Sequence, residues 1–201
     1  MISQENGSLI EMIPPAAREA AGRLFADPGE TILRADAPAS HFYLLEAGSA
    51  KLVCEPIDSP PLIIDIYHAG DFFGEMEMVG LEIKDRSVVA LTACELLCFT
   101  RDQFFHLWDQ ERAFSRTILA VHCRRLLAAG DDKVYTDGTL LSQRVLRVIH
   151  GHTSPGGWFL YTKQILAELT GISMRSLNRT LKALQLDGLI DVQAGAIRLK
   201  Y

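Results

Sequence analysis

The chain has 201 residues, of which 48% are hydrophobic and 22% are charged, a composition typical of globular proteins and not of disordered or fibrous ones. Its longest apolar runs are four residues, far short of the ~18 needed for a membrane-spanning helix. Residues 1–10 contain no basic residue that could start a secretory signal. We therefore expect a cytoplasmic protein of two small domains with no membrane partner.

Charge divides the chain near Thr139. Residues 1–139 hold 12 Lys and Arg against 22 Asp and Glu, whereas residues 140–201 hold 8 against 3. A small basic module on an acidic body favours a partner with a phosphate backbone for the C-terminal part.

Short β-branched and aromatic runs follow an N-terminal helical segment, residues 8–24, in which Pro14 and Pro15 fit a helix start. The runs are residues 30–33, 41–45, 49–54, 62–67, 87–91 and 95–99. Turn residues separate them, a pattern typical of an antiparallel sandwich or barrel. We therefore expect an all-β domain over residues 1–100.

Residues 101–132 contain no proline, and no glycine before Gly130, and so predict a long helix. Phe114, Ile118 and Val121 recur at close to a 3.5-residue spacing, which favours a seam between two copies of the helix. Periodicity alone leaves open the alternative that this face packs on the β domain. Residues 133–139 predict a hinge before the second domain, residues 140–201.

A helix-turn-helix pattern lies between residues 162 and 186. Thr162 can cap a helix over residues 163–169, Gly171 suits the turn, and Ser173 can cap a second helix. Apolar residues at helical spacing are expected to face inward: Leu166, Ala167, Leu169, Ile172, Leu177, Leu181 and Leu184. Residues 187–192 and 196–200 predict a β-hairpin after it, which completes a winged helix-turn-helix.

The other face of the second helix carries cationic and amide side chains, the groups that read base edges in the major groove. The residues predicted to contact double-stranded DNA are Thr162, Lys163, Ser173, Met174, Arg175, Ser176, Asn178, Arg179 and Lys182. The alternative is an ordinary solvated helix face, which the combination of caps, turn glycine, wing and positive charge argues against.

The order of these parts resembles the CRP/FNR family of bacterial transcription regulators. The motifs that carry the resemblance are Phe42-Tyr-Leu-Leu-Glu-Ala-Gly48, Gly70-Asp-Phe-Phe-Gly-Glu75, Leu91-Thr-Ala-Cys-Glu-Leu-Leu97, Ile165-Leu-Ala-Glu-Leu-Thr-Gly-Ile-Ser173 and Leu177-Asn-Arg-Thr-Leu-Lys182. The Gly74-Glu75-Met-Glu-Met segment is also similar to a YeiL-like branch. The resemblance implies an α+β fold with an antiparallel, cyclic-nucleotide-binding-like β-roll, a long dimerisation helix and a winged helix-turn-helix. It also implies an effector-controlled homodimer that binds DNA, and RNA polymerase if it is an activator.

The ligand site departs from the family pattern. The resemblance assigns ligand binding to Gly74 and Glu75, with Glu75 on the ribose, and to an Arg-Ser pair on the cyclic phosphate. Arg86 and Ser87 look like that pair but lie two residues late, about 6.6 Å along a strand, so that Lys84 and Asp85 fall on the phosphate positions.

The long helix departs from the family pattern as well. It offers Ala129 and Gly130, which lack side-chain hydrogen-bonding groups, where relatives contact adenine. We therefore expect cyclic AMP to bind weakly or not at all, and the sequence does not identify the effector.

No other cofactor is indicated. The first 53 residues hold no cysteine, so we expect no iron-sulfur cluster, and Cys54, Cys94, Cys98 and Cys123 are interpreted as reduced, structural thiols. The histidines are scattered, and no metal site is expected.

A cupin-type enzyme would need a His-x-His motif within residues 28–100, which is missing, so we expect no enzyme. The remaining rival is a ligand-sensing module that acts through protein partners without DNA.

Overall fold

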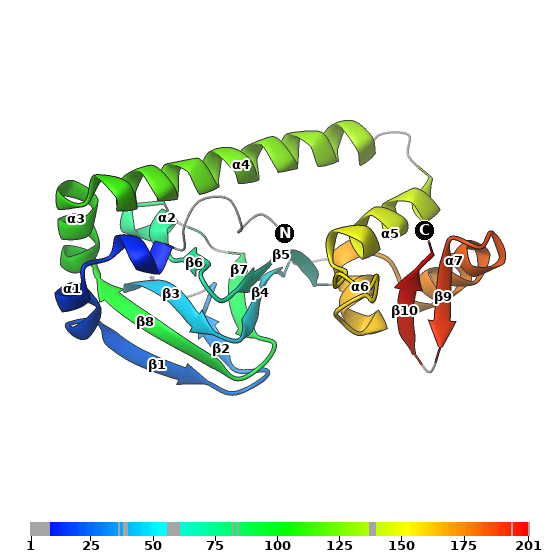
Figure 1. Cartoon of the computed structure of the whole chain (residues 1–201), viewed down its shortest axis with the longest axis horizontal. Coiled ribbons are helices and arrows are strands. Elements are labelled where there is room, and N and C mark those ends of the chain that lie inside the picture. The colour runs from blue at the N-terminus through cyan, green and yellow to red at the C-terminus, as the bar shows by residue number, and fades with distance from the viewer. Residues whose placement is uncertain are drawn as a thin grey trace. The chain divides into compact units, whose positions relative to one another are not determined.

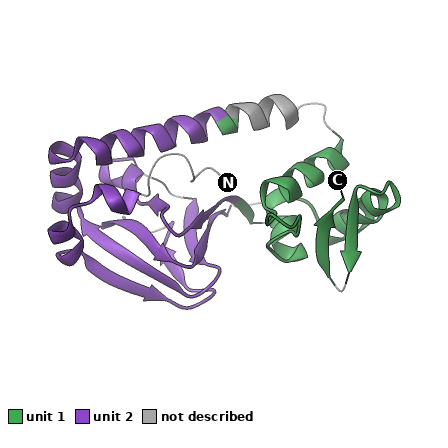
Figure 2. Cartoon of the chain, in the orientation of Figure 1, with its two compact units in different colours: residues 1, 60–63, 128–201 green, residues 2–59, 64–127 purple. Residues whose placement is uncertain are grey.

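The computed structural model describes residues 9–35, 37, 40–55, 61–81, 83, 85–136, 140–193 and 195–200. Figure 1 labels its helices and strands in chain order. The chain divides into two compact units, residues 2–59 with 64–127 and residues 1, 60–63 and 128–201 (Figure 2). Within the described residues, no helix is long and apolar enough to cross a membrane.

Two four-stranded sheets form the N-terminal roll. One has the order β1-β8-β3-β6 and the other β2-β7-β4-β5. Their strands are β1 (Gly22–Ala26), β2 (Thr31–Leu33), β3 (His41–Ala47), β4 (Ser49–Cys54), β5 (Leu62–His68), β6 (Phe72–Phe73), β7 (Arg86–Ala90) and β8 (Cys94–Thr100). The paired ladders β1·β8, β3·β8, β3·β6, β2·β7 and β4·β7 are antiparallel. The predicted antiparallel β domain is thus confirmed.

The N-terminal segment differs from the prediction of one helix over residues 8–24. A 3-10 helix, η1 (Leu9–Met12), precedes a single turn of α-helix, α1 (Pro15–Glu19), and β1 then begins at Gly22. Pro15 stands at the first helical position as expected. The helix ends early because Gly22–Ala26 pairs with β8 from Gly22↔Cys98 to Ala26↔Cys94, a tertiary contact that local periodicity does not report.

Strands β3 and β8 are buried on both faces. Successive side chains of a strand point to opposite sides, and in these two strands each side belongs to a different buried cluster. Leu45, Cys94 and Leu96 face the space between the two sheets, where one buried cluster lies. Leu44 and Leu97 belong to a second buried cluster, which includes helical residues. The roll therefore has one core inside and another between a sheet and the helices.

The predicted helix over residues 101–132 is two helices. They are α3 (Arg101–Gln110) and α4 (Arg112–Thr136), separated at Glu111, whose backbone has φ −107° and ψ 89°. The Thr100 hydroxyl accepts a hydrogen bond from the amide of Gln103, and the Gln103 side chain accepts one from the Thr100 amide, which fixes the start of α3. The predicted hinge also changes, because α4 continues to Thr136, and residues 137–139 lie outside the described residues.

The structure corrects the predicted dimer seam. Phe114 is fully buried and Ile118 is 2% exposed, both within the cluster that joins α3 and α4 to the roll, and Val121 packs against that cluster. The Phe114 ring lies 5.8 Å from the ring of Phe42 on β3. These three residues attach α4 to its own chain, which was the alternative that periodicity left open.

A different face of α4 is open. It carries Leu119, Leu126 and Leu127, which are 60%, 76% and 69% exposed, together with the exposed Cys123. Leu119, Cys123 and Leu126 are spaced by four and three residues and therefore lie on one side of the helix. We call these three residues the open stripe of α4.

The C-terminal unit has the predicted winged helix-turn-helix. It contains α5 (Leu141–Gly151), α6 (Lys163–Thr170), α7 (Met174–Leu186) and the antiparallel hairpin β9 (Ile190–Gln193) and β10 (Ala196–Leu199). The inward residues predicted between 166 and 184 all belong to its core, Leu169 and Ile172 as partly buried members. Residues 158–161 contribute two isolated bridges, of Phe159 to Thr153 and of Trp158 to Arg198.

Candidate nucleic-acid interface and effector site

Local hydrogen bonds set the start of both helices of the helix-turn-helix. The Thr162 hydroxyl accepts a 3.3 Å bond from the Ile165 amide, and the Ser173 hydroxyl accepts a 3.3 Å bond from the Ser176 amide. Gly171 ends α6 at φ 64°, a left-handed conformation that favours glycine. The short turn between α6 and α7 thus follows directly from the sequence.

The first three turns of α7 present a polar face. Its four exposed long side chains are Arg175, Asn178, Arg179 and Lys182, while Met174 and Ser176 are partly buried. Leu177, Leu181 and Leu184 on the opposite side are at most 3% exposed. Because the buried leucines fix the rotation of α7, the two guanidiniums and the amide point away from the domain core.

Lys163 and Thr162 lie at the start of α6. Lys163 is half-buried and Thr162 is exposed. The hydroxyls of Thr162 and Ser173 therefore have structural roles as helix caps, in addition to any contact that they make with a ligand.

Arg144 of α5 makes a contact that the sequence did not signal. Its Nη2 donates a 2.6 Å hydrogen bond to the backbone carbonyl of Thr170, the last residue of α6. A guanidinium at a helix C-terminus also complements the negative end of the helix dipole. Arg144 thus holds the end of α6 next to the turn that orients α7.

A cation-π contact supports the wing. The Arg198 guanidinium carbon of β10 lies 5.4 Å from the centre of the Trp158 ring, and its Nε donates to the Gly156 carbonyl at 3.3 Å. Trp158 nevertheless stays 38% exposed.

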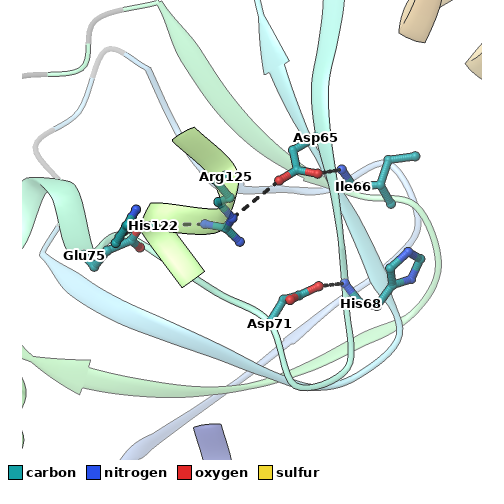
Figure 3. Close-up of polar contacts among 7 residues, drawn as sticks. All are labelled: Asp65, Ile66, His68, Asp71, Glu75, His122 and Arg125. Carbon is teal, nitrogen blue, oxygen red and sulfur yellow. Dashed lines mark hydrogen bonds and ion pairs between the residues drawn. The ribbon is translucent and has the colours of Figure 1, made fainter. Parts of the chain in front are cut away.

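In the roll, Glu75 contacts side chains of α4 (Figure 3). Glu75 begins α2 (Glu75–Met78), directly after Gly74, and is 5% exposed. Its Oε1 lies 3.2 Å from His122 Nε2 and 4.0 Å from Arg125 Nη1. Its Oε2 is buried and has no hydrogen-bond partner. The carboxylate that the family resemblance assigns to a ligand thus already faces two basic groups of its own chain.

Arg125 has further partners on the roll. Its Nε lies 3.7 Å from Asp65 Oδ2, and its guanidinium carbon lies 5.2 Å from the ring centre of Tyr67 and 5.4 Å from that of Phe72. Burial raises the pKa of Tyr67, which keeps the phenol neutral under the cation. Arg125 therefore lies between aromatic rings and two carboxylates.

Arg86 and Ser87 have other partners. Arg86 Nε is 3.8 Å from Asp85 Oδ1, and the other oxygen of Asp85 accepts a 3.4 Å hydrogen bond from the Cys54 thiol. Ser87 Oγ accepts a 3.2 Å hydrogen bond from the Ala35 amide. A phosphate at this pair would therefore meet the Asp85 carboxylate as a neighbour.

The cysteines differ in exposure and chemistry. Cys94 is buried, Cys54 and Cys98 are partly exposed, and Cys123 is exposed. Burial raises the pKa of Cys98 to about 11, so its thiol is protonated near neutral pH. In the part of the chain that the structure describes, no three His, Cys, Asp or Glu side chains cluster as metal ligands do.

Two family models match the chain. The cyclic nucleotide-binding domain matches residues 23–111, and the Crp-like helix-turn-helix domain matches residues 141–200. The first covers most of the roll and α3, and the second covers α5 to the wing.

Curated relatives agree with both matches. The CRP-like protein Clp of Xanthomonas campestris pv. campestris is 26% identical over 183 residues, which span 84% of this chain and 79% of Clp. A cAMP-dependent protein kinase regulatory subunit of Aspergillus fumigatus is 37% identical over 79 residues, 39% of this chain. The match spans only 18% of that subunit.

Solved structures share the whole fold. The c-di-GMP-responsive global regulator CLP of Xanthomonas campestris aligns over 96% of this chain and 98% of its own, with a TM-score of 0.78 and 22% identity. A CooA mutant of Carboxydothermus hydrogenoformans aligns over 100% of this chain and 94% of its own, with a TM-score of 0.81 and 12% identity. The YeiL-like branch stays a prediction. With a cyclic nucleotide-binding domain and a Crp-like helix-turn-helix domain in this order, the chain is a DNA-binding transcription regulator of the CRP/FNR family, which is not a family of enzymes.

Proposed function

We propose that the chain acts as an effector-controlled homodimer whose two α7 helices read successive major grooves of a two-fold symmetric DNA site. The observation that carries the proposal is the row of Arg175, Asn178, Arg179 and Lys182 on the exposed face of α7, opposite its buried leucines. In a helix-turn-helix this face enters the groove, and half-sites lie ~34–36 Å apart.

The base-reading residues differ from those of many relatives, which carry Glu where this chain has Arg175. Arg175 and Arg179 can each donate hydrogen bonds to O6 and N7 of a guanine. Neither can accept a hydrogen bond from the amino group of cytosine or adenine. Asn178 adds a group suited to adenine. We therefore expect a half-site that departs from the family's usual TGTGA or TTGAT.

Phosphate contacts complete the proposed interface. Their role is to fix the register of the protein on the duplex without reading sequence. The residues proposed for it are Thr162, Lys163, Ser173, Ser176 and Lys182. Met174, whose thioether cannot donate a hydrogen bond to a phosphate, is proposed to contact the DNA through apolar surface.

The second copy is proposed to bind along the open stripe of α4. Leucines that are 60% and 76% exposed in the single chain supply the apolar surface for such contact. A parallel pair of α4 helices would place the two stripes against each other, as in a coiled coil.

The effector of the roll is proposed not to be cyclic AMP. Asp85 lies beside Arg86, Ser87 already accepts a hydrogen bond, and Glu75 is paired with α4. Isothermal calorimetry with cyclic AMP should show no binding tighter than millimolar. The same measurement with c-di-GMP is informative because the relative CLP responds to it. Micromolar cyclic AMP binding would contradict this part of the proposal.

Selection from a random duplex library tests the DNA-binding function. Arg179→Ala should weaken the free energy of binding to the preferred duplex by about 1–3 kcal/mol and relax the base preference at one base pair. Lys163→Ala should weaken binding to all sequences alike and reduce the slope of log affinity against log salt concentration by about one. Gln185→Ala, an exposed change later on α7, is the control. If the selection recovers no preferred sequence and the protein shows no salt-dependent binding to duplex DNA, the rival function is favoured, a module that acts through protein partners. A cytoplasmic location, and contact with RNA polymerase if the protein is an activator, belong to the same proposal and depend on the same result.

A further inference from the structure

A cavity of about 610 Å³ lies where α1 meets α3 in the N-terminal unit (Figure 1). This volume is within the range of small-molecule binding sites. None of its lining residues is among the partners of Glu75, so the cavity is separate from the candidate effector site of the roll. Most of its wall is apolar, made by Pro14, Ala16, Ala17, Ala20, Phe99 and Leu107.

Hydrogen bonds and core packing hold the two helices that form this cavity. Gln103 Nε2 donates a 3.0 Å hydrogen bond to the Ala20 carbonyl at the end of α1, and Gln103 Oε1 accepts a 2.9 Å bond from the Thr100 amide. Phe99 and Leu107 belong to the buried cluster that joins the roll to the helices. The wall is thus formed before any ligand binds, which lowers the ordering cost of binding.

The remaining polar groups of the wall are Asp102, His106 and Glu111, all from α3 or its C-terminal cap. In the part of the chain that the structure describes, neither carboxylate forms an ion pair or a side-chain hydrogen bond. No described Lys or Arg lines the cavity either. The wall therefore combines an apolar surface with uncompensated negative charge, which complements a cation.

Glu111 is the better placed of the two carboxylates to bind that cation. It is partly buried, whereas Asp102 is exposed, so water screens its charge less. Glu111 also caps the C-terminus of α3, where the helix carbonyls attract positive charge. The two acids are nine residues apart, about 13.5 Å along the helix, so a compact ammonium group contacts only one of them.

We propose that this cavity binds a small molecule with an apolar body and a primary amino group. The body lies against Phe99 and Leu107, and the ammonium donates charge-assisted hydrogen bonds to Glu111. An anion would instead meet two carboxylates and no described cation. The proposal goes beyond the proposed function, and its test needs no DNA.

Three probes that share a phenyl ring and a short alkyl chain separate the contributions of shape and charge. They are 4-phenylbutylamine, 4-phenylbutanol and 4-phenylbutyrate, which at pH 7 are cationic, neutral and anionic. Backbone amide chemical shifts of the full chain are followed during each titration. The amine should bind with a dissociation constant of about 1 mM or tighter, the alcohol at least about tenfold more weakly, and the acid not at all. The shifts should concentrate in residues 14–20 and 99–111.

Two variants test the named contacts. Glu111→Gln should weaken amine binding about tenfold and leave alcohol binding unchanged, because it removes only the charge. Glu19→Gln, the same change at an exposed acid of α1 that does not line the cavity, is the matched control and should change neither. Ala16→Phe should abolish binding of the amine and of the alcohol, because Ala16 is an exposed part of the wall where a larger side chain fills the cavity.

The proposal is overturned if the alcohol or the acid binds as tightly as the amine, or if the shifts lie outside the two segments. Equal amine binding by Glu111→Gln and the wild type, or equal loss in Glu19→Gln, would overturn it as well. Should Ala16→Phe fail to fold, Glu111→Gln decides, because it replaces one oxygen by nitrogen in a side chain without a described partner.

Discussion

Replacement of two leucines of the open stripe by glutamate should convert the dimer into folded monomers. Leu119 and Leu126 are 60% and 76% exposed in the single chain, so neither supports the fold of its own protomer. In a two-fold dimer each contributes twice, and a carboxylate at either position would face its own copy at low dielectric.

The expected loss follows from these exposed fractions. Complete burial of a leucine is worth about 1.5–3 kcal/mol, and scaling by the fractions gives about 4–8 kcal/mol per dimer for the two leucines. That corresponds to a rise of the dissociation constant by roughly 10³- to 10⁶-fold. A nanomolar dimer would then dissociate at micromolar concentration.

Sedimentation velocity across a concentration series measures the change. The wild type should sediment as a dimer, and Leu119→Glu/Leu126→Glu should sediment as a monomer with an unchanged circular dichroism spectrum. Leu186→Glu, at a leucine 79% exposed at the end of α7, should remain dimeric. Ile118→Glu should instead unfold the roll, because that side chain is 2% exposed in its core. A double variant that stays dimeric at low micromolar concentration would refute the assignment of the stripe.

Three smaller predictions concern stability and reactivity. Arg144→Met should lower the free energy of unfolding by about 1.5–3 kcal/mol, because the hydrogen bond to the Thr170 carbonyl is charge-assisted, and thermal denaturation would show it. Gly48→Ala should cost more than ~2 kcal/mol and Gly29→Ala only ~1, since both have φ near 90° but only at Gly48 would a Cβ lie 2.2 Å from a backbone carbonyl. Iodoacetamide should label Cys98 slowly at pH 8 and faster as pH approaches its pKa of about 11; rapid labelling at pH 8 in the folded protein would contradict its burial.

Local signals explain why the helix-turn-helix was predictable. Thr162, Gly171 and Ser173 each act within four residues of their own position, and the inward leucines repeat at helical spacing. The strands were predictable for the same reason, since turn residues bound short β-branched runs. These features depend on neighbours in the chain.

Features that depend on distant residues were not predictable. Glutamate is a good helix former, so nothing local marks the break at Glu111. It arises because Phe104 of α3 and Phe114 of α4 enter the same buried cluster, with their rings 6.0 Å apart. The two apolar faces of α4 also look alike in the sequence, and only the roll decides that the face of Ile118 is covered.

The candidate ligand site shows the same limit with a functional consequence. The family resemblance pointed to Glu75 but not to its partners, because His122 and Arg125 approach it only through the packing of α4 on the roll. An effector that contacts Glu75 Oε1 competes with His122 and Arg125 for the same carboxylate oxygen. Because such linkage is reciprocal, an effector of this kind weakens the attachment of α4 to Glu75 by the same factor by which that attachment weakens effector binding. An effector that instead contacts the unpartnered Oε2 leaves the contacts of Oε1 with α4 in place.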